Sequence, residues 1–205
     1  MTIPSSIVIE YRQSSKDELP LILELQRRNL PKNITVEEAS EQGFVTLEHD
    51  LELLTEMNEP HGHTVAIAAG IDGKGTDDER IELVGYALTI TKDFRHRLPE
   101  TLRSFFDFVE TLSWKGKSIG TENISYVAMG QVCVAKKYRG KYGVFAALYK
   151  EMARRLSSAG YDVIVTAISS KNTRSLRAHK KIGFIEIHKS EDDPDHNWVV
   201  VGLGI

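Results

Sequence analysis

A glycine-bearing turn between regular segments constrains the fold of this chain more than any other feature. Tyr126–Val134 has the composition of a strand, Val144–Ser158 has apolar residues at helical spacing, and Asp162–Ile168 is almost wholly apolar. An apolar run of that length is typical of a strand covered on both faces. The sequence therefore predicts a strand, a helix and a second, parallel strand, joined as a right-handed β-α-β unit.

Positive charge is concentrated in and after this turn. Lys136–Lys189 contains thirteen of the 26 Lys and Arg residues but three acidic residues, in a chain whose formal net charge is −3. Gly140 and Gly143 let the backbone of the turn approach a ligand closely. Unpaired N–H groups at the start of the following helix favour an anion there. The pattern predicts that a small polyanion binds at the turn.

The rest of the chain predicts an α/β (α+β) fold of one domain, 1–205. Its mixed, mostly antiparallel sheet is expected to have about six or seven strands and helices on both faces. Loops are expected at 72–78, 115–123 and 191–195. Further strands are expected at Ile7–Tyr11, Thr64–Ile71, Ile81–Thr91, Phe184–Ile187 and Trp198–Val201, and helical regions at Asp17–Asn29, Thr35–Met57, Pro99–Leu112 and 172–183.

Several classes of protein do not fit the composition. The longest apolar runs fall short of the roughly 20 residues that span a bilayer, and the N-terminus lacks the pattern of a signal peptide. Cys133 is the single cysteine, which excludes an intramolecular disulfide and fits a reducing compartment. His61 and His63 have no third metal ligand nearby in sequence. We expect a cytoplasmic protein without a metal or a membrane partner.

Two phosphate-binding motifs can be tested directly against the turn. The Rossmann pattern fails because a third glycine is missing, and the Walker pattern fails because no Gly-Lys-Ser/Thr opens the helix. With these two motifs excluded, the remaining candidate ligand is an acyl carrier that contains a pyrophosphate. Residues 132–148, VCVAKKYRGKYGVFAAL, resemble the acetyl-CoA signature of the GNAT superfamily of N-acetyltransferases. Residues 172–184, NTRSLRAHKKIGF, resemble its second signature, and the resemblance covers roughly 126–187, the expected cofactor-binding core.

The resemblance implies a GNAT-type fold that transfers an acetyl group from acetyl-CoA to a primary amine. It implies that the strand before the turn pairs with the pantothenate arm, that the turn surrounds the pyrophosphate and that Asn172 lies near the pantetheine. The cofactor-binding residues implied in this way are Val132, Cys133, Val134, Arg139, Gly140, Lys141, Tyr142, Gly143, Val144, Asn172 and Ser175. Counted from Arg139, the usual glycine positions of the turn hold Tyr142 and Val144, so this loop contains an extra residue or takes a different path.

Two residues are candidates for catalytic roles by the same resemblance. Many members place a tyrosine four residues before the Gly-Phe glycine, where it protonates the departing thiolate; here His179 occupies that place. The alternative is a helix-face histidine without a catalytic role. Gln131 lies in the strand where some members keep a glutamate base. It cannot act as a base, so we expect a water-relayed base or binding of the neutral amine.

Other interpretations stay open or are disfavoured. The chain could be a non-catalytic module that binds acetyl-CoA or CoA for regulation. Nucleic-acid binding is disfavoured because the basic segment lacks interleaved aromatic and basic stripes. Cys133 is expected to be a buried structural thiol, not an acyl-carrying nucleophile. The sequence leaves open a small amine, a peptide or a protein as acceptor, and also whether the chain forms a homodimer.

Overall fold

The computed structural model describes residues 7–69, 81–190 and 197–205. The loops expected at 72–78 and 191–195 lie outside the described residues. In the described part of the chain, no helix combines the length and the apolar composition needed to cross a membrane.

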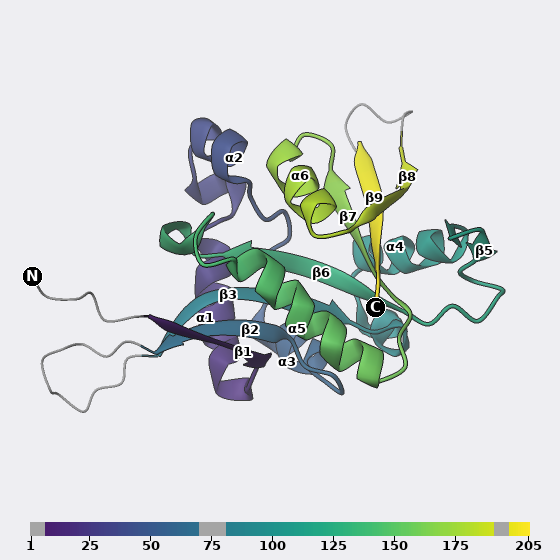
Figure 1. Cartoon of the computed structure of the whole chain (residues 1–205), viewed down its shortest axis with the longest axis horizontal. Coiled ribbons are helices and arrows are strands. Elements are labelled where there is room, and N and C mark those ends of the chain that lie inside the picture. Colours follow the sequence, from purple (N-terminus) through teal and green to yellow (C-terminus); the bar gives the residue numbers. More distant parts are fainter. Residues whose placement is uncertain (1–6, 70–80, 191–196) are drawn as a thin grey trace, which may run out of the picture.

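A seven-stranded sheet forms the centre of the molecule (Figure 1). Neighbouring strands run antiparallel except for β6 and β7, which are parallel. The predicted mixed, mostly antiparallel sheet is therefore confirmed. In the order β1-β2-β3-β6-β7-β9-β8, the strands are Val8–Gln13, Thr64–Ala69, Ile81–Ile90, Tyr126–Val134, Val163–Ser169, Trp198–Gly204 and Ile185–Lys189.

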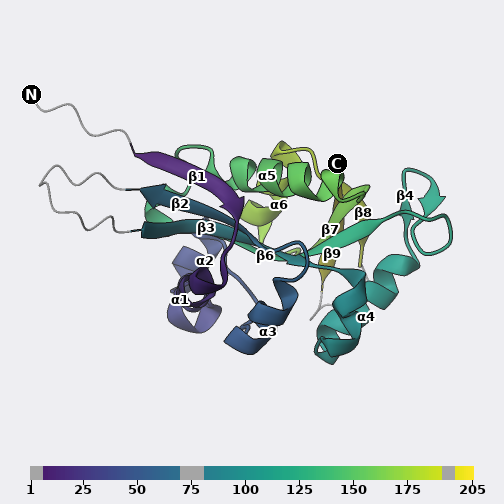
Figure 2. The same cartoon turned by 90° about the horizontal axis from the view of Figure 1, so that it is seen from below.

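Helices cover both faces of this sheet, as predicted. Figure 2 shows α5 and α6 on one face and α1, α3 and α4 on the other. Helix α5 packs through a buried stripe that recurs at three and four residues, which includes Leu148, Tyr149 and Met152. The helices are α1 Leu19–Arg27, α2 Val36–Gln42, α3 Leu51–Met57, α4 Glu100–Glu110, α5 Val144–Ser158 and α6 Thr173–Lys181.

The helical region expected over Thr35–Met57 is wrong in its continuity. Helix α2 stops at Gly43, whose φ of 75° suits glycine, and α3 starts afresh at Asp50, whose side chain accepts a hydrogen bond from Leu53 N. Between them the chain is irregular and buries Val45. Leucines at helical spacing continue across the break, and for this reason the sequence pattern predicted one continuous helical region. The polar loop expected over 115–123 likewise contains part of a small hairpin, β4 Ser113–Trp114 with β5 Lys117–Ser118.

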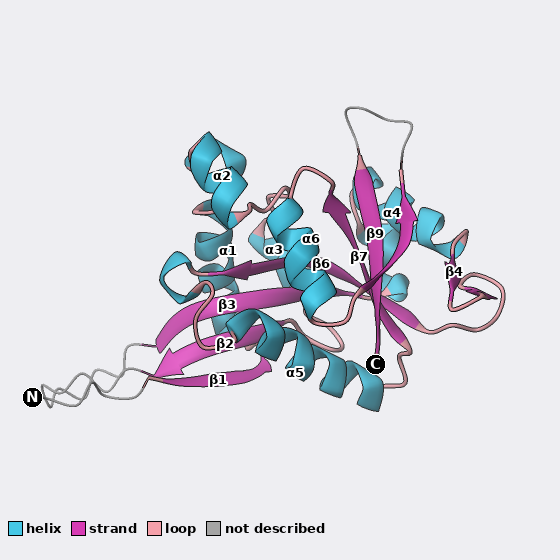
Figure 3. Ribbon diagram, turned by 45° about the horizontal axis from the view of Figure 1, so that its top comes forward, coloured by secondary structure: helices cyan, strands magenta, loops and turns pink. Residues whose placement is uncertain are grey.

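Strands β6 and β7 separate soon after they meet. Their pairing covers Tyr126–Ala128 and ends there, and the Thr166 hydroxyl donates to Met129 O at 2.9 Å where the strands part. On its other side β6 stays paired with β3, but two of its residues, Gly130 and Gln131, lie opposite the single residue Leu88. This β-bulge bends β6 away from β7. Figure 3 shows β7, β8 and β9 turned away from the direction of β3 and β6.

Three of the histidines that the structure describes are buried. His63 is fully covered: its Nδ1 accepts Thr89 N–H at 3.1 Å and its Nε2 contacts Leu54 O at 3.2 Å. His49 and His179 are nearly as covered. Burial lowers the pKa of each of these three side chains to about 4. All three are therefore neutral in the folded protein near neutral pH.

Acidification is expected to lower the free energy of unfolding even at pH values above the range in which carboxylates titrate. Histidine in an unfolded chain has a pKa of about 6.5, so the unfolded state binds these protons first. The free energy of unfolding is then highest above about pH 6.5 and falls as pH decreases toward about 4, by up to about 1.4 kcal/mol per pH unit for each histidine. Urea unfolding measured between about pH 7 and pH 5 tests this, and His63→Gln should flatten the slope whereas exposed His96→Gln should not. Equal stability across that interval would contradict the assignment.

Candidate functional site

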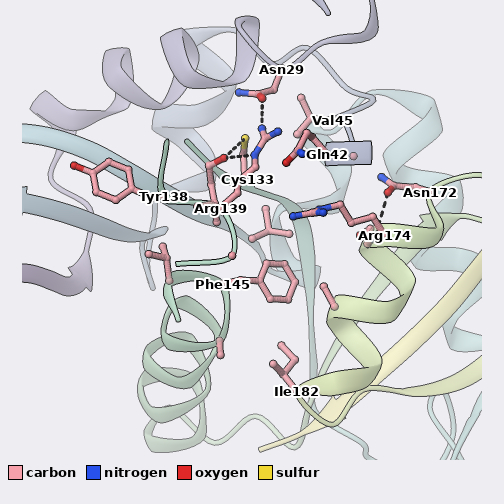
Figure 4. A pocket seen from close by; sticks show the side chains of 18 of the residues that line it. Asn29, Gln42, Val45, Cys133, Tyr138, Arg139, Phe145, Asn172, Arg174 and Ile182 are labelled. Carbon is pink, nitrogen blue, oxygen red and sulfur yellow. Dashed lines mark hydrogen bonds between the residues drawn. The ribbon is translucent and has the colours of Figure 1, made fainter. Parts of the chain in front are cut away.

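A cavity of about 540 Å³ lies where β6 leaves β7 (Figure 4). One wall is the end of β6, Val132–Val134, and the opposite wall is α6. The turn before α5 and the first residues of that helix close one end. Residues Gln42–Val45, at the end of α2 and just after it, and Asn29, just after α1, complete the lining. The cavity thus joins both predicted signature segments to parts of the chain that carry no motif.

Among the described strands, none pairs with the edge of β6 that faces this cavity. Ala135 N donates to Val84 O across the β3 pair, and hydrogen-bonding direction alternates along an antiparallel strand. Val132 and Val134 therefore turn their backbone N–H and C=O groups away from β3 and toward the cavity. We call these groups the open edge of β6. Such an edge can accept an extended chain of amides as an added strand.

The turn is held in place by Tyr138 and shaped by left-handed residues. Tyr138 is buried and donates its hydroxyl to Glu82 Oε2 at 2.9 Å. Gly140, Tyr142 and Gly143 all have positive φ, and α5 starts at Val144 without a side-chain cap. The backbone N–H groups of the first turn of α5 are thus left for a ligand. The Tyr142 side chain is 60% exposed and does not line the cavity, so the departure from the usual glycine sends this side chain outward.

Positive charge lines the cavity. Among the described residues, no acidic side chain contributes to its walls, whereas Arg139, Lys141, Arg174 and Lys181 do. The Arg139 guanidinium donates from Nε to Val134 O at 2.7 Å and from Nη2 to Asn29 Oδ1. Its Nη1 is buried and has no partner among the described atoms. A cation held in this way favours an anionic ligand beside it.

The start of α6 ties the walls together. Asn172 accepts a hydrogen bond from Ser175 N at 3.1 Å and donates from Nδ2 to Phe44 O at 3.3 Å. Arg174 donates to Glu41 O at 2.8 Å. Asn172 is therefore the N-cap of α6, and the same side chain also holds the Gln42–Val45 segment over the cavity. Ser175 lines the cavity beside it.

His179 lies behind the cavity wall and does not contribute to it. It is 1% exposed and packs among the rings of Phe145, Tyr149 and Phe184. Its Nε2 contacts the Tyr149 hydroxyl at 2.7 Å, and its Nδ1 contacts Ser175 O at 2.8 Å. Both ring nitrogens are thus engaged inside the protein. Like Tyr142, this predicted site residue does not line the cavity.

Gln131 is also engaged internally. It is 6% exposed, and its Oε1 accepts hydrogen bonds from the Tyr86 hydroxyl and, at 3.1 Å, from Gln26 Nε2. Its Nε2 donates to Leu47 O at 2.8 Å. Gln131 therefore anchors the segment between α2 and α3 to the bulge of β6. It does not line the cavity.

Cys133 lines the cavity but is 6% exposed. Burial raises the pKa of its thiol to about 11, so the thiol is protonated near neutral pH. The nucleophilic thiolate is therefore scarce at this position. The burial and the raised pKa of Cys133 fit the expected buried structural thiol.

His61 and His63 both contact other residues of the protein. His61 Nε2 lies 3.2 Å from the Tyr161 hydroxyl, and His63 is buried as described above. Within the described ranges, no three His, Cys, Asp or Glu side chains gather as a metal site.

Sequence reasoning missed the part of the cavity that comes from elsewhere in the chain. Asn29 and Gln42–Val45 belong to the N-terminal third, and no motif distinguishes them. Phe145, Ala178 and Ile182 were visible as helical residues, but not as residues of a cavity wall. Tertiary packing brings them there, and the positive φ of Gly43 is the one local feature that a glycine in the sequence could have signalled.

Comparisons with known proteins agree with this architecture. Residues 120–192 match the family model described as FR47-like protein. A sequence search of curated proteins finds no match. Arabidopsis thaliana NAA60, solved in complex with acetyl-CoA, is similar with a TM-score of 0.62 and 15% identity over 97% of this chain and 100% of that one.

Two further solved structures are similar over nearly their whole length. An acetyltransferase of the GNAT family from Streptococcus agalactiae gives a TM-score of 0.57 at 14% identity, over 96% of this chain and 95% of that one. A ribosomal-protein-alanine N-acetyltransferase from Escherichia coli gives 0.56 at 10% identity, over 97% and 94%. Likeness at such low identity establishes the fold. Together with the family match, it confirms the resemblance read from the two signatures: the chain has the fold of the GNAT superfamily of N-acetyltransferases.

Proposed function

We propose that this chain transfers an acetyl group from acetyl-CoA to a primary amine of a small molecule, a peptide or a protein. The observation that carries the proposal is the open edge of β6 beside a basic cavity that ends at the start of α5. Val132 and Val134 offer backbone groups to an extended arm of amides, and the N–H groups at the start of α5 suit a diphosphate. Acetyl-CoA combines these two features in one molecule.

Arg139 supports this fit in particular. Its Nε satisfies Val134 O, one of the groups that the amide arm would use, and its Nη1 is buried without a partner. Binding of the arm at the open edge would displace Nε from this oxygen. The guanidinium would then be free for a phosphate, in the cavity that Lys141 also lines.

The chain contributes positioning and electrostatics to the proposed reaction. When bound, acetyl-CoA supplies a thioester whose carbonyl carbon is open to attack by an amine. The backbone N–H groups of the open edge of β6, which lines the cavity, can donate to the developing oxyanion. Among the described residues, no carboxylate or imidazole lines the cavity as a base. The amine therefore enters neutral or gives its proton to water.

A second candidate function is a non-catalytic CoA-binding module. It is favoured by one observation: the two residues first considered for catalysis, His179 and Gln131, are both engaged in internal hydrogen bonds. Turnover separates the two functions. An acetyltransferase releases free CoA thiol from acetyl-CoA when a suitable amine from a panel is added. A binding module gives heat with CoA in calorimetry but no amine-dependent release.

Charge reversal at the cavity mouth is expected to weaken binding of acetyl-CoA. Lys141 lines the cavity and is exposed, so Lys141→Glu places a negative charge near the expected diphosphate. Calorimetry at low ionic strength should show a loss of affinity of about tenfold or more. Lys150→Glu is the matched control, because Lys150 is exposed on α5 but does not line the cavity. Equal loss in both variants would count against the assigned phosphate position.

Acetyl transfer is expected to proceed without an acetylated cysteine. Because burial raises the pKa of Cys133 to about 11, acetyl-CoA incubated with the protein should leave this thiol unmodified. Intact-protein mass spectrometry measures this, and Cys133→Ala should retain CoA binding. Acetylation of Cys133 that an amine then removes would instead establish a covalent route. A lone thiol of this kind also fits our inference that the protein acts in the reducing cytoplasm.

A further inference from the structure

The hydrogen bonds of His179 determine which of its ring nitrogens carries the proton. Ser175 O can only accept, so the contact of 2.8 Å from Nδ1 requires a proton on Nδ1. The ring is neutral near neutral pH because burial lowers its pKa to about 4. Its Nε2 is therefore an acceptor, and the Tyr149 hydroxyl donates to it at 2.7 Å. In this state His179 has no proton to give at Nε2.

The same assignment leaves the Ser175 hydroxyl with a free hydrogen. Ser175 Oγ lies 3.3 Å from His179 Nδ1, which already carries a proton, so Oγ can only accept at this contact. The structure describes no acceptor for the hydroxyl hydrogen of Ser175. Residues 175, 178 and 182 recur at i, i+3 and i+7 and line the cavity together, whereas His179 turns to the core. Ser175 thus brings an unused donor to the cavity wall.

Two other polar side chains of the cavity wall use their donors elsewhere in the protein. Tyr138 also lines the cavity, but its hydroxyl donates to Glu82 Oε2. Asn172, on the same wall as Ser175, uses Nδ2 on Phe44 O. Among the described residues of the lining, Ser175 is therefore the hydroxyl whose hydrogen is unused. It lines the same cavity as the open edge of β6, along which the arm of acetyl-CoA is proposed to lie.

We propose that Ser175 donates a hydrogen bond to the sulfur of the departing CoA thiolate, and that His179 and Tyr149 are positioning residues that fix the Ser175 hydroxyl. This inference rests on the proposed acetyltransferase function. It moves the donor one helical turn from the place that the superfamily signature indicates. The Nδ1–H group of His179 then donates to Ser175 Oγ. Because Oγ accepts at this contact, the Ser175 hydroxyl keeps its own hydrogen for donation into the cavity.

The step that Ser175 assists is balanced as follows. The amine nitrogen forms a bond to the thioester carbonyl carbon, and the tetrahedral oxyanion collapses with cleavage of the C–S bond. The sulfur leaves with the electron pair, and the amine loses its proton to water. Ser175 keeps its own proton and stabilises the thiolate by a charge-assisted hydrogen bond. Water supplies the proton that converts the released thiolate into free CoA thiol.

The thiol pKa of bound CoA tests this without an acceptor. Ultraviolet absorbance of the thiolate is followed against pH for saturating CoA on the wild-type protein, on Ser175→Ala and on Ser175→Thr. Loss of the donor should raise the pKa of the bound thiol by about one unit or more in the alanine variant. The threonine variant keeps a hydroxyl and should stay near the wild-type value. Ser158→Ala, an exposed serine of α5 whose hydroxyl bonds Arg154 O, is the matched control.

The outcomes separate this inference from the function on which it rests. Arg139, Lys141, Arg174 and Lys181 also favour a thiolate, but they are the same in all variants, so the difference reports Ser175. An unchanged thiol pKa in Ser175→Ala, with CoA still bound, would overturn the role of Ser175 and leave the proposed function intact. Equal pKa values in the alanine and threonine variants would also overturn it. Failure of the wild-type protein to bind CoA in calorimetry would overturn the proposed function, and this inference with it.

Discussion

The separation of β6 from β7 after Ala128 is the constraint on which the rest of the site depends. A parallel pair inside a sheet normally satisfies both edges of each strand, but here the bulge at Gly130–Gln131 turns β6 away while β3 still holds its other side. The result is an edge of the sheet at Val132 and Val134 that pairs with no other described strand. Such an edge can pair with a ligand that supplies amides.

The surrounding contacts keep that opening accessible and charged. Arg174 attaches the start of α6 to the end of α2, and Asn172 attaches it to the segment that follows. Gln131 attaches later residues of that segment to β6. These hydrogen bonds hold the Gln42–Val45 segment over the cavity without filling it. Arg139 spans from Val134 to Asn29, so the open edge of β6 and the end of α1 are linked through one guanidinium.

Local patterns were sufficient to predict the β-α-β unit, the mostly antiparallel sheet and the position of the turn in the chain. Each of these leaves a short-range signal, such as the apolar run before Ile168 or the glycines at 140 and 143. The break between α2 and α3 was missed because leucine spacing outweighed Gly43 and Asp50. The orientation of His179 could not be read either: its place in the signature is a matter of spacing, whereas its direction is set by Tyr149 and two phenylalanine rings on other elements. Asn29 and the Gln42–Val45 segment reach the cavity through tertiary packing alone.

Backbone hydrogen exchange at Val132 and Val134, followed by nuclear magnetic resonance with and without CoA, tests the central claim most directly. Val132 and Val134 N–H groups point into the cavity and lack a strand partner, so exchange should be fast in the free protein and strongly slowed when CoA occupies the open edge. Neighbouring Cys133, which pairs with Tyr86, should be protected in both states. Saturation with CoA that leaves exchange at Val132 and Val134 unchanged would contradict the account.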